Sequence, residues 1–195
     1  MNQKVIIEIS AHHCHISQKD LDLIYGKNYQ LTPIKPLSQI GQFASRETIN
    51  IKIGDKIIKN VRILGPVRKN TQIEISETEA HYLKIKPPIA ECTCPKKSGG
   101  CVISEIIGPK GKINRCAIII ARRHLHIDPA TAKKIGLKNK QLISATTMGK
   151  KSVTFHNILV RIDPNFRPSI HLDTDEGNAA GIKLNEKATI INNKY

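Results

Sequence analysis

Two pairs of histidines have the residue type and spacing needed to bind metal ions. The pairs are His13 with His15 and His124 with His126, and they stand 111 residues apart in the chain. Side chains two positions apart in a β-strand point to the same face, so each pair could present two imidazoles to one ion. A single such pair is usually two solvated histidines at a strand end. Because the pair recurs in the same local setting, we expect two related halves, each with a metal site.

The local setting of each pair is a strand, the two histidines, a helix cap, a short helix and a glycine. In the first half an alternating strand over residues 5–9 continues into the histidines on one face, and Ser17 caps a helix over about 18–25. In the second half Asp128 is the cap, and a proline opens a helix over about 129–135. The shared order supports a duplicated unit.

Short alternating segments between these motifs predict a mainly β fold. A capping box of Ser76 and Glu79 opens one more helix, which ends near residue 83. Many short strands with few short helices favour small β-barrels, so we expect two similar β-barrel domains with short capping helices. We assign residues 1–90 to the first and 91–195 to the second, and strands could exchange between them. The other expected strands are 48–53, 57–64, 71–75, 102–107, 113–120, 141–147, 153–155 and 158–162.

The composition indicates a soluble protein with a positive surface. The chain has 195 residues, 39% of them hydrophobic, and lacks Trp, so Ile, Leu, Val and Ala must build the core. The formal net charge of +15 attracts polyanions such as nucleic acid, a phosphorylated cofactor or a phosphate substrate. The Lys are scattered and aromatic residues make up only 4%, so the stacking surface typical of RNA binding is missing. With neither a membrane-spanning apolar run nor a signal-peptide pattern, we expect a cytoplasmic protein without membrane contact.

The five cysteines are an odd number, which argues against a disulfide framework in an intracellular chain. Cys92, Cys94 and Cys101 could hold a structural metal, but no convincing fourth ligand stands nearby, so loop thiols are the favoured interpretation. Cys14 shows the opposite strand face from the histidines beside it, so we expect it to be packed. Cys116 lies on a predicted strand.

An ordered set of motifs makes the chain resemble the PduL-type phosphotransacylases, the phosphate propanoyltransferase family. The set spans nearly the whole chain and consists of segments 9–17, 41–44, 61–69, 71–76, 108–111, 121–126, 160–162 and 171–180. The chain departs from the family pattern at His12, Cys14, His156 and Gly177, none of which is an expected ligand. Family members packaged in bacterial microcompartments often carry an N-terminal amphipathic extension. None precedes the first strand here, so we do not expect a microcompartment location.

The resemblance implies two zinc ions per chain, held by His13, His15 and Glu74 and by His124, His126 and His171. Three protein ligands and an open position are typical of catalytic zinc, although cobalt, iron or manganese also suits such ligands. Judged by position alone, Glu74 would be a solvated strand carboxylate and His171 a core histidine. The carboxylates of Asp173, Asp175 and Glu176 could orient ligands from outside the metal shell.

The resemblance also implies substrate contacts. Arg68 follows a Gly-Pro turn, and the resemblance assigns it to the phosphoryl group, whose charge a guanidinium fork can stabilise. Without the resemblance Arg68 is one more cation among 31. The expected coenzyme A contacts are Arg62, Asn178 and the backbone segment of Glu8, Ile9 and Ser10.

The activity that the resemblance implies is that of a phosphate acyltransferase. The enzyme would interconvert a short-chain acyl-CoA and phosphate with an acyl phosphate and CoA, by metal-assisted direct attack of the CoA thiolate. The sequence does not decide between acetyl and propanoyl, although the missing extension favours acetyl. The alternatives are a two-zinc hydrolase of phosphorylated or thioester substrates, and a basic nucleic-acid-binding barrel with structural metal sites. Because two ions in one reaction must be close, we expect the active site between the two halves. A homodimer is the default oligomeric state.

Overall fold

The computed structural model describes residues 3–91 and 101–191, and these divide into two compact units. The described residues up to Ser10 and from Arg122 onward form the barrel unit, and those from Ala11 to Ala121 form the half-barrel unit. This division differs from the expected halves 1–90 and 91–195. The N-terminal strand belongs with the C-terminal half of the chain, and residues 101–121 belong with the N-terminal half.

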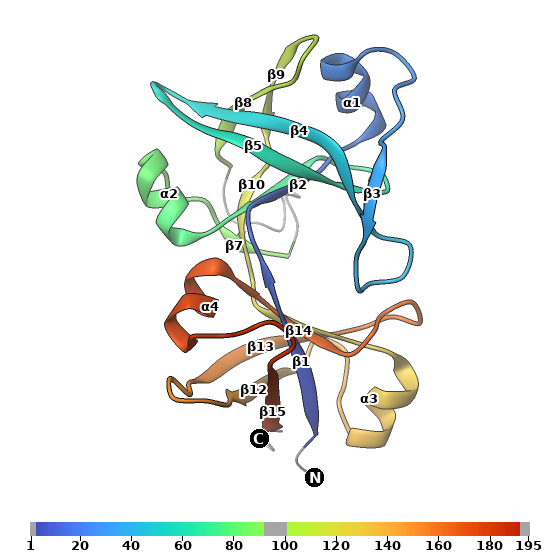
Figure 1. The fold of residues 1–195 in the computed structure, drawn as a ribbon, viewed down its shortest axis with the longest axis vertical. Coiled ribbons are helices and arrows are strands. Elements are labelled where there is room, and N and C mark those ends of the chain that lie inside the picture. The colour runs from blue at the N-terminus through green and yellow to red at the C-terminus, as the bar shows by residue number, and fades with distance from the viewer. Residues whose placement is uncertain (1–2, 92–100, 192–195) are drawn as a thin grey trace. The chain divides into compact units, whose positions relative to one another are not determined.

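Six strands close into a barrel in the barrel unit (Figure 1). Their order is β1-β14-β11-β13-β12-β15, and β15 pairs with β1 to complete the ring. The helices α3 and α4 lie on opposite sides of this barrel in Figure 1. The bounds are β1 Lys4–Ser10, β11 His124–Ile127, α3 Pro129–Ile135, β12 Leu142–Thr147, β13 Thr154–Ile162, β14 Ser169–Asp173, α4 Thr174–Ala180 and β15 Lys187–Ile191.

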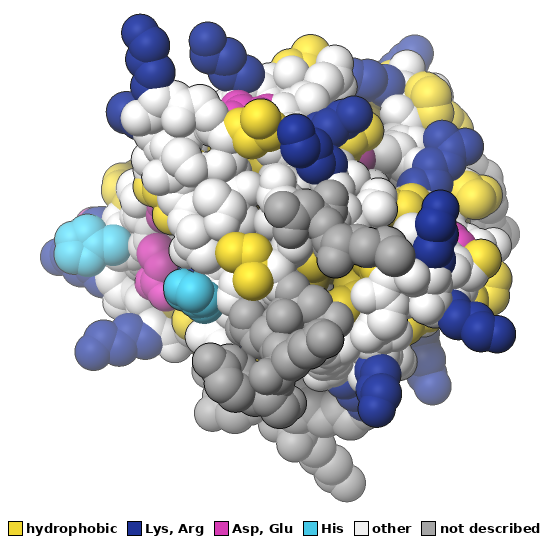
Figure 2. Space-filling view, turned by 90° about the horizontal axis from the view of Figure 1, so that it is seen from below, with side chains coloured by type: hydrophobic (Ala, Val, Ile, Leu, Met, Phe, Trp, Pro, Cys, Tyr) yellow, Lys and Arg dark blue, Asp and Glu magenta, His cyan; other side chains and the backbone are white. Residues whose placement is uncertain are grey.

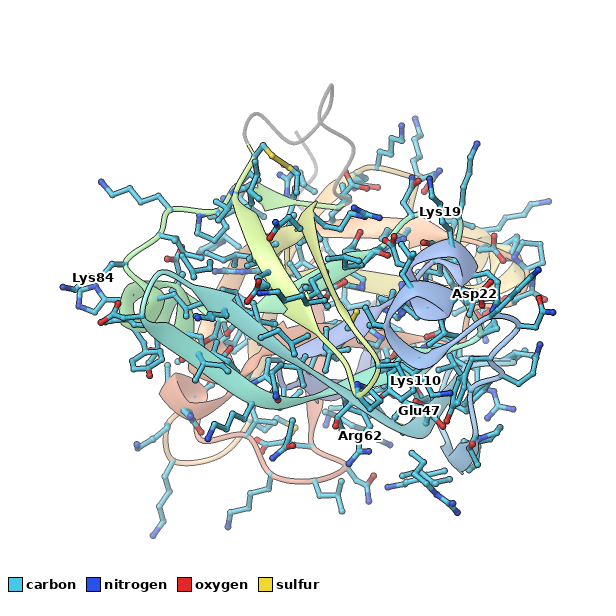
Figure 3. The ribbon with its side chains drawn as sticks, turned by 90° about the horizontal axis from the view of Figure 1, so that it is seen from above. Lys19, Asp22, Glu47, Arg62, Lys84 and Lys110 are labelled. Atoms are coloured by element: carbon cyan, nitrogen blue, oxygen red, sulfur yellow. A yellow bond between two sulfur atoms is a disulfide. The ribbon has the colours of Figure 1, made fainter. Side chains whose placement is uncertain are left out.

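The half-barrel unit contains one sheet of nine strands. The path through it is β7-β10-β6-β2-β5-β4-β8-β9, and β3 pairs with the N-terminal end of β4. Helix α1 lies beside the β8–β9 turn, where the backbone N–H of Lys110 donates to the carbonyl of Ile24 at 3.0 Å (Figure 3). The bounds are β2 His13–His15, α1 Gln18–Tyr25, β3 Pro33–Pro36, β4 Phe43–Ile53, β5 Lys56–Gly65, β6 Gln72–Ile75, α2 Glu77–Leu83, β7 Ile89–Ala90, β8 Ile103–Ile107, β9 Lys112–Cys116 and β10 Ile118–Ala121.

Each unit has its own core, built mainly from isoleucine, leucine and valine. In β1 the alternation is visible in the burial, because Val5 and Ile7 are 3% and 4% exposed whereas Ile6 is 40% exposed. Burying one such side chain contributes about 1.5–3 kcal/mol. Each unit therefore packs around an apolar core of its own.

The two units repeat one arrangement of four strands. In the half-barrel unit β10 runs parallel to β6, β6 antiparallel to β2, and β2 parallel to β5. In the barrel unit β1 runs parallel to β14, β14 antiparallel to β11, and β11 parallel to β13. The prediction of a mainly β fold of two similar barrel-type domains with capping helices is confirmed. The repeat also explains the division of the chain, because β1 and β10 hold equivalent places and each belongs to the unit of the other half.

The three expected helices are present with their expected caps at Ser17, Ser76 and Asp128. Helix α4 was not expected. The strand predictions differ in several places: β13 is continuous where two strands were expected, and β9 and β10 are separate where one was expected. The strands β3, β7, β14 and β15 were not predicted. Asn157 accounts for the first error, because it interrupts the alternation of β13 with a left-handed backbone at φ 59°. The expected continuity from residue 9 to His13 is also wrong, since β1 ends at Ser10 and β2 starts at His13.

The cysteines differ from expectation. Cys101 and Cys116 form a disulfide with their Cα atoms 5.4 Å apart, so Cys101 is not the free loop thiol that we expected. The odd number of cysteines does not exclude a disulfide, because Cys14 is free. Cys14 is also buried, as predicted. Cys92 and Cys94 lie outside the described residues. Among the helices of the described ranges, none has the length and apolarity to cross a membrane.

Candidate functional site

The half-barrel unit brings His13, His15 and Glu74 together. The histidines lie on β2 and Glu74 on the antiparallel neighbour β6, where Glu74 is the direct cross-strand partner of His13. The Nε2 atom of His13 is 3.4 Å from Oε2 of Glu74, and one nitrogen or oxygen of each residue lies within 4.8 Å of the others. His13 and His15 are 8% and 5% exposed. These donors therefore converge at a largely buried point.

The barrel unit brings His124, His126 and His171 together in the same way. His124 and His126 lie on β11, and His171 on the antiparallel neighbour β14 is the direct partner of His124. The ring of His171 stacks on His124 with 4.9 Å between centroids, and its centroid is 4.5 Å from that of His126. One nitrogen of each lies within 4.8 Å of the others. The register of the first cluster is thus repeated.

The first histidine of each pair is oriented by the same hydrogen bond. Nδ1 of His13 lies 2.9 Å from the carbonyl oxygen of Ala11, and Nδ1 of His124 lies 2.9 Å from that of Arg122. A carbonyl oxygen only accepts, so Nδ1 must carry the proton and Nε2 keeps its lone pair. Such bonds fix the tautomer of metal-binding histidines. Both histidines therefore present Nε2 as a ligand atom.

The third residue of each cluster is held by the side chain two positions before it. Nε2 of Gln72 donates to Oε1 of Glu74 at 2.6 Å, and Oγ of Ser169 is 3.0 Å from Nε2 of His171. The sequence analysis missed both supporting residues. The signal was the strand period of two, which puts residues 72 and 74, and likewise 169 and 171, on one face.

The protonation of His15 fits a metal ligand. Burial, followed by the nearby charge of Arg68 and by His13, lowers the pKa of His15 to about 3. Its imidazole is therefore neutral at physiological pH. Its Nδ1 atom is buried and has no hydrogen-bond partner among the described residues. A buried, neutral and unpaired nitrogen beside a carboxylate and a second imidazole fits a divalent ion such as zinc.

Arg68 lies just beyond β5, at the edge of the half-barrel cluster. Its backbone N–H donates to the carbonyl of Ile16 at 2.8 Å, which ties its loop to the chain leaving β2. Its side chain is exposed, and its charge contributes to the lowered pKa of His15. The structure therefore brings Arg68 near the His13, His15 and Glu74 cluster.

A buried carboxylate that we did not predict secures the Arg68 loop. Asp20 of α1 is 4% exposed and accepts from Oγ1 of Thr71 at 2.5 Å and from Nη2 of Arg115 at 2.6 Å. Burial opposes ionisation of Asp20, but the hydrogen bonds from Arg115 and Thr71 outweigh it and lower its pKa. Thr71 also accepts from the backbone N–H of Ser17 at 3.1 Å. No local sequence pattern indicates this network, because Asp20, Thr71 and Arg115 are far apart in the chain.

Comparisons with known proteins show which family the chain resembles. A family model described as phosphate propanoyltransferase matches residues 6–183. A phosphate propanoyltransferase of Thermotoga maritima is 40% identical over 96% of this chain and 89% of its own length. Those of Lachnoclostridium phytofermentans and Clostridioides difficile are 41% and 36% identical, over 96% and 95% of this chain and 87% and 88% of their own lengths.

The chain belongs to the phosphate propanoyltransferase family. It is therefore an enzyme, a phosphate acyltransferase.

The residues expected to contact CoA lie in both units of this phosphate acyltransferase. Arg62 on β5 is the parallel partner of His13, and its Nη1 donates to the carbonyls of Ser45 at 3.1 Å and Arg46 at 2.8 Å (Figure 3). Glu8, Ile9 and Ser10 lie on β1, and Asn178 lies exposed on α4. Within the barrel unit the structure brings β1 and α4 together, because Ile9 packs against Gly177.

Besides the third donor, which is Glu74 in one cluster and His171 in the other, a neighbouring position distinguishes the two clusters of the acyltransferase. Glu8 on β1 is the parallel partner of His171, with Oε2 of Glu8 3.5 Å from Nε2 of His171. The equivalent partner of Glu74 on β10 is Ile119, which is 1% exposed. The barrel cluster therefore has a carboxylate where the half-barrel cluster has an apolar side chain.

The positions at which this family member departs from the expected pattern are all in packed or hydrogen-bonded places. His12 hydrogen bonds to Glu79 in the capping box of α2, which raises the pKa of His12. Cys14 is fully buried, and Nδ1 of His156 is 2.8 Å from Oγ of Ser144. A Cβ atom on Gly177 would lie 2.6 Å from Cδ1 of Ile9. Glycine there lets Ile9 pack close to α4.

The carboxylates after His171 serve the helix. Asp173 is the N-cap of α4, where it accepts from the N–H of Glu176 at 2.8 Å, and Glu176 accepts from the N–H of Asp173 at 3.1 Å. Glu176 also pairs with Nε of Arg123 at 2.6 Å. Burial raises the pKa of both carboxyl groups. The contacts of Asp173 and Glu176 therefore cap α4 and anchor it. Any influence of these two residues on the orientation of His171 would act through the end of β14.

Proposed function

We propose that this chain interconverts acetyl-CoA or propanoyl-CoA and phosphate with the acyl phosphate and CoA, using a zinc ion at each of its two clusters. The observation that carries the proposal is the repeated cluster: three donors on two antiparallel strands, with the first histidine directly opposite the third donor in both units. Three protein donors leave a position for substrate, which is the arrangement of catalytic zinc. Bound there, zinc would favour the thiolate form of a thiol and polarise a carbonyl oxygen.

The protein side chains contribute fixed orientation and charge. The carbonyls of Ala11 and Arg122 hold His13 and His124 in one tautomer, and burial keeps His15 neutral. Because these groups are oriented before substrate arrives, little reorganisation is needed during the reaction. The CoA thiolate would attack the acyl carbonyl directly, and phosphate would leave.

Arg68 would bind the phosphoryl group. Its guanidinium can donate two parallel hydrogen bonds to phosphate oxygens and stabilise the charge that develops on the leaving group. Support comes from its exposed side chain next to the half-barrel cluster and from the backbone bond to Ile16 that fixes its loop.

A covalent acyl-enzyme is not needed for this reaction, and two candidate nucleophiles are poor ones. Burial raises the pKa of the Cys14 thiol, which keeps it protonated. Ser144 hydrogen bonds to His156, but Ser144 is only 1% exposed. Direct transfer between two bound substrates is therefore the favoured mechanism.

The test is the phosphate-dependent release of free thiol from acetyl-CoA and propanoyl-CoA, and the reverse reaction with acyl phosphate and CoA. Arg68→Ala should raise the KM for phosphate and acyl phosphate by about 10-fold or more, since a charge-assisted pair is lost, with little change in the KM for CoA. Lys69→Ala removes a neighbouring exposed cation and is the matched control.

Two results would count against the proposal. An equal rise in KM for phosphate and CoA in Arg68→Ala would make Arg68 a structural residue. Hydrolysis of acyl phosphate or acyl-CoA without transfer would favour the two-zinc hydrolase.

A further inference from the structure

The segment from Gly41 to Ala44 is a family motif that the proposed mechanism leaves without a role. In the fold it lies beside the segment that carries Arg68, because β4 pairs antiparallel with β5 and Phe43 is the direct partner of Gly65. Together the two segments line a half-open cavity of about 240 Å³. Its walls are Ile40, Gly41, Gln42, Gly65, Pro66 and Arg68.

The loop before β4 gives one wall of the cavity a defined shape. The N–H of Leu37 donates to the carbonyl of Gln42 at 3.0 Å, and the N–H of Gln42 donates to the carbonyl of Gln39 at 3.1 Å. Gly41 has a φ of 77°, a conformation that side chains disfavour. The loop therefore closes on itself and presents Ile40 and Gln42 from a fixed backbone.

The opposite wall is fixed by the contact of Phe43 with Gly65. A Cβ atom on Gly65 would lie 2.2 Å from Cζ of Phe43, so the ring packs directly on the glycine backbone. Pro66 follows in this wall, and Arg68 completes it. A larger residue at position 65 would displace the ring and the wall with it.

The wall groups match the parts of a short acyl phosphate. Arg68 suits the phosphoryl group, the side chains of Ile40 and Pro66 are apolar, and the amide of Gln42 can donate to a carbonyl oxygen. The volume is below the roughly 300–1,000 Å³ typical of pockets for drug-sized ligands, so the cavity suits a small molecule. If the phosphoryl group binds Arg68, a cavity of this size leaves room for an acyl chain of only a few atoms.

We propose that this cavity binds the acyl phosphate, with its acyl chain against Ile40 and Pro66, and that Ile40 sets the chain length the enzyme accepts. The inference rests on the proposed function, since it takes Arg68 as the phosphoryl contact. It adds the acyl subsite and a residue that determines specificity.

The experiment compares Ile40→Ala with wild type on acetyl, propanoyl and butanoyl phosphate at saturating CoA. One methylene is worth about 10-fold or more in a fitted apolar pocket, and butanoyl has two more than acetyl, so the ratio of kcat/KM for butanoyl over acetyl phosphate should rise by at least about 10-fold in Ile40→Ala. Ile40→Phe should change the ratio in the opposite direction. The KM for CoA should stay the same in both variants. Because Ile40 is 57% exposed, neither change should disturb folding.

Ile34→Ala is the matched control, because Ile34 is 54% exposed on β3 and does not line the cavity. If Ile40→Ala and Ile40→Phe alter the ranking of acyl phosphates no more than Ile34→Ala does, the acyl subsite is wrong while the proposed function stands. If wild-type protein transfers no acyl group from any of the three substrates to CoA, the proposed function is wrong. The acyl subsite, which rests on that function, is then wrong as well.

Discussion

At the scale of single residues, several side chains of the two clusters use one polar atom in a hydrogen bond. The other polar atom of each is then available to a metal ion. His13 and His124 each use Nδ1 on a backbone carbonyl, and Glu74 uses Oε1 on Gln72. The remaining atoms, Nε2 and Oε2, are those that converge in the half-barrel cluster, at 3.4 Å for His13 and Glu74. Partners of this kind orient metal ligands and raise their affinity.

The role of Gln72 can be measured separately from the ligands. Gln72→Ala removes the donor to Glu74, so the half-barrel cluster should bind zinc about 10-fold to 100-fold more weakly while the barrel cluster is unchanged. The measurement is competition with a zinc chelator, which should then resolve one weakened site and one normal site. Gln30→Ala on an exposed loop is the control. Two sites of wild-type affinity in Gln72→Ala would show that Gln72 does not support Glu74.

At the scale of elements, each of the four strands that carry cluster residues leads into a helix cap two residues after its last cluster residue. The pairs of cluster residue and cap are His15 with Ser17, Glu74 with Ser76, His126 with Asp128, and His171 with Asp173. Because a capped helix fixes the direction in which the chain leaves the strand, the cap also fixes the strand end that carries the ligand. The cluster residues are therefore positioned by short local motifs.

The Asp20 network provides a stability test at this scale. Asp20→Asn removes the charge that Arg115 and Thr71 share, and it should lower the free energy of unfolding by about 1.5–3 kcal/mol at neutral pH. The folded-state pKa of Asp20 is lowered, so its contribution is present above the usual carboxyl pKa and is lost as pH falls through the lower folded-state value.

Urea unfolding of wild type and Asp20→Asn over a pH series measures this difference. The gap should be widest near neutral pH and should close in acid. Asp22→Asn on the same helix is the control, since its carboxylate bonds to Gln18 only one turn away. A gap that is constant with pH would mean that the charge of Asp20 contributes nothing.

These local motifs also explain how much could be predicted from the sequence. The caps at Ser17, Ser76 and Asp128 follow simple residue patterns, and the helices after them have the expected bounds. Helix α4 was missed although Asp173 and Glu176 form the same capping box and Gly181 ends the helix. The capping-box pattern could have predicted this helix, but the acidic residues were interpreted as groups that orient ligands from outside the metal shell.

The remaining differences come from contacts between distant parts of the chain. Asp20 and Arg115 are 95 residues apart, and no local pattern connects them. The place of β1 beside β14 is also a long-range pairing, between Glu8 and His171 for example. Duplication was visible in the sequence, but which half each strand joins depends on pairing energies that residue patterns do not record.

At the scale of the whole molecule, the formal charge of +15 acts on substrates that are anions. On the face shown in Figure 2, Lys and Arg side chains are spread around the surface and do not gather into one patch. A diffuse positive field attracts CoA and phosphate without specifying a binding site, and it raises association rates.

This field predicts a salt dependence. The kcat/KM for CoA should fall steadily as sodium chloride rises from 0.01 to 0.3 M, because the screening length shortens from roughly 30 Å to under 8 Å. The kcat at saturating substrates should change much less. Sucrose at matched viscosity is the control for diffusion. A kcat/KM that does not respond to salt would exclude electrostatic attraction as a rate effect.

Elemental analysis tests most directly whether duplication has given each unit its own metal site. Protein purified without chelator should contain two metal ions per chain, one for each three-donor cluster. His13→Ala and His124→Ala should each retain one ion, and both should lose most phosphate-dependent acyl transfer. Less than about one ion per wild-type chain, or a full complement in either variant, would contradict the account.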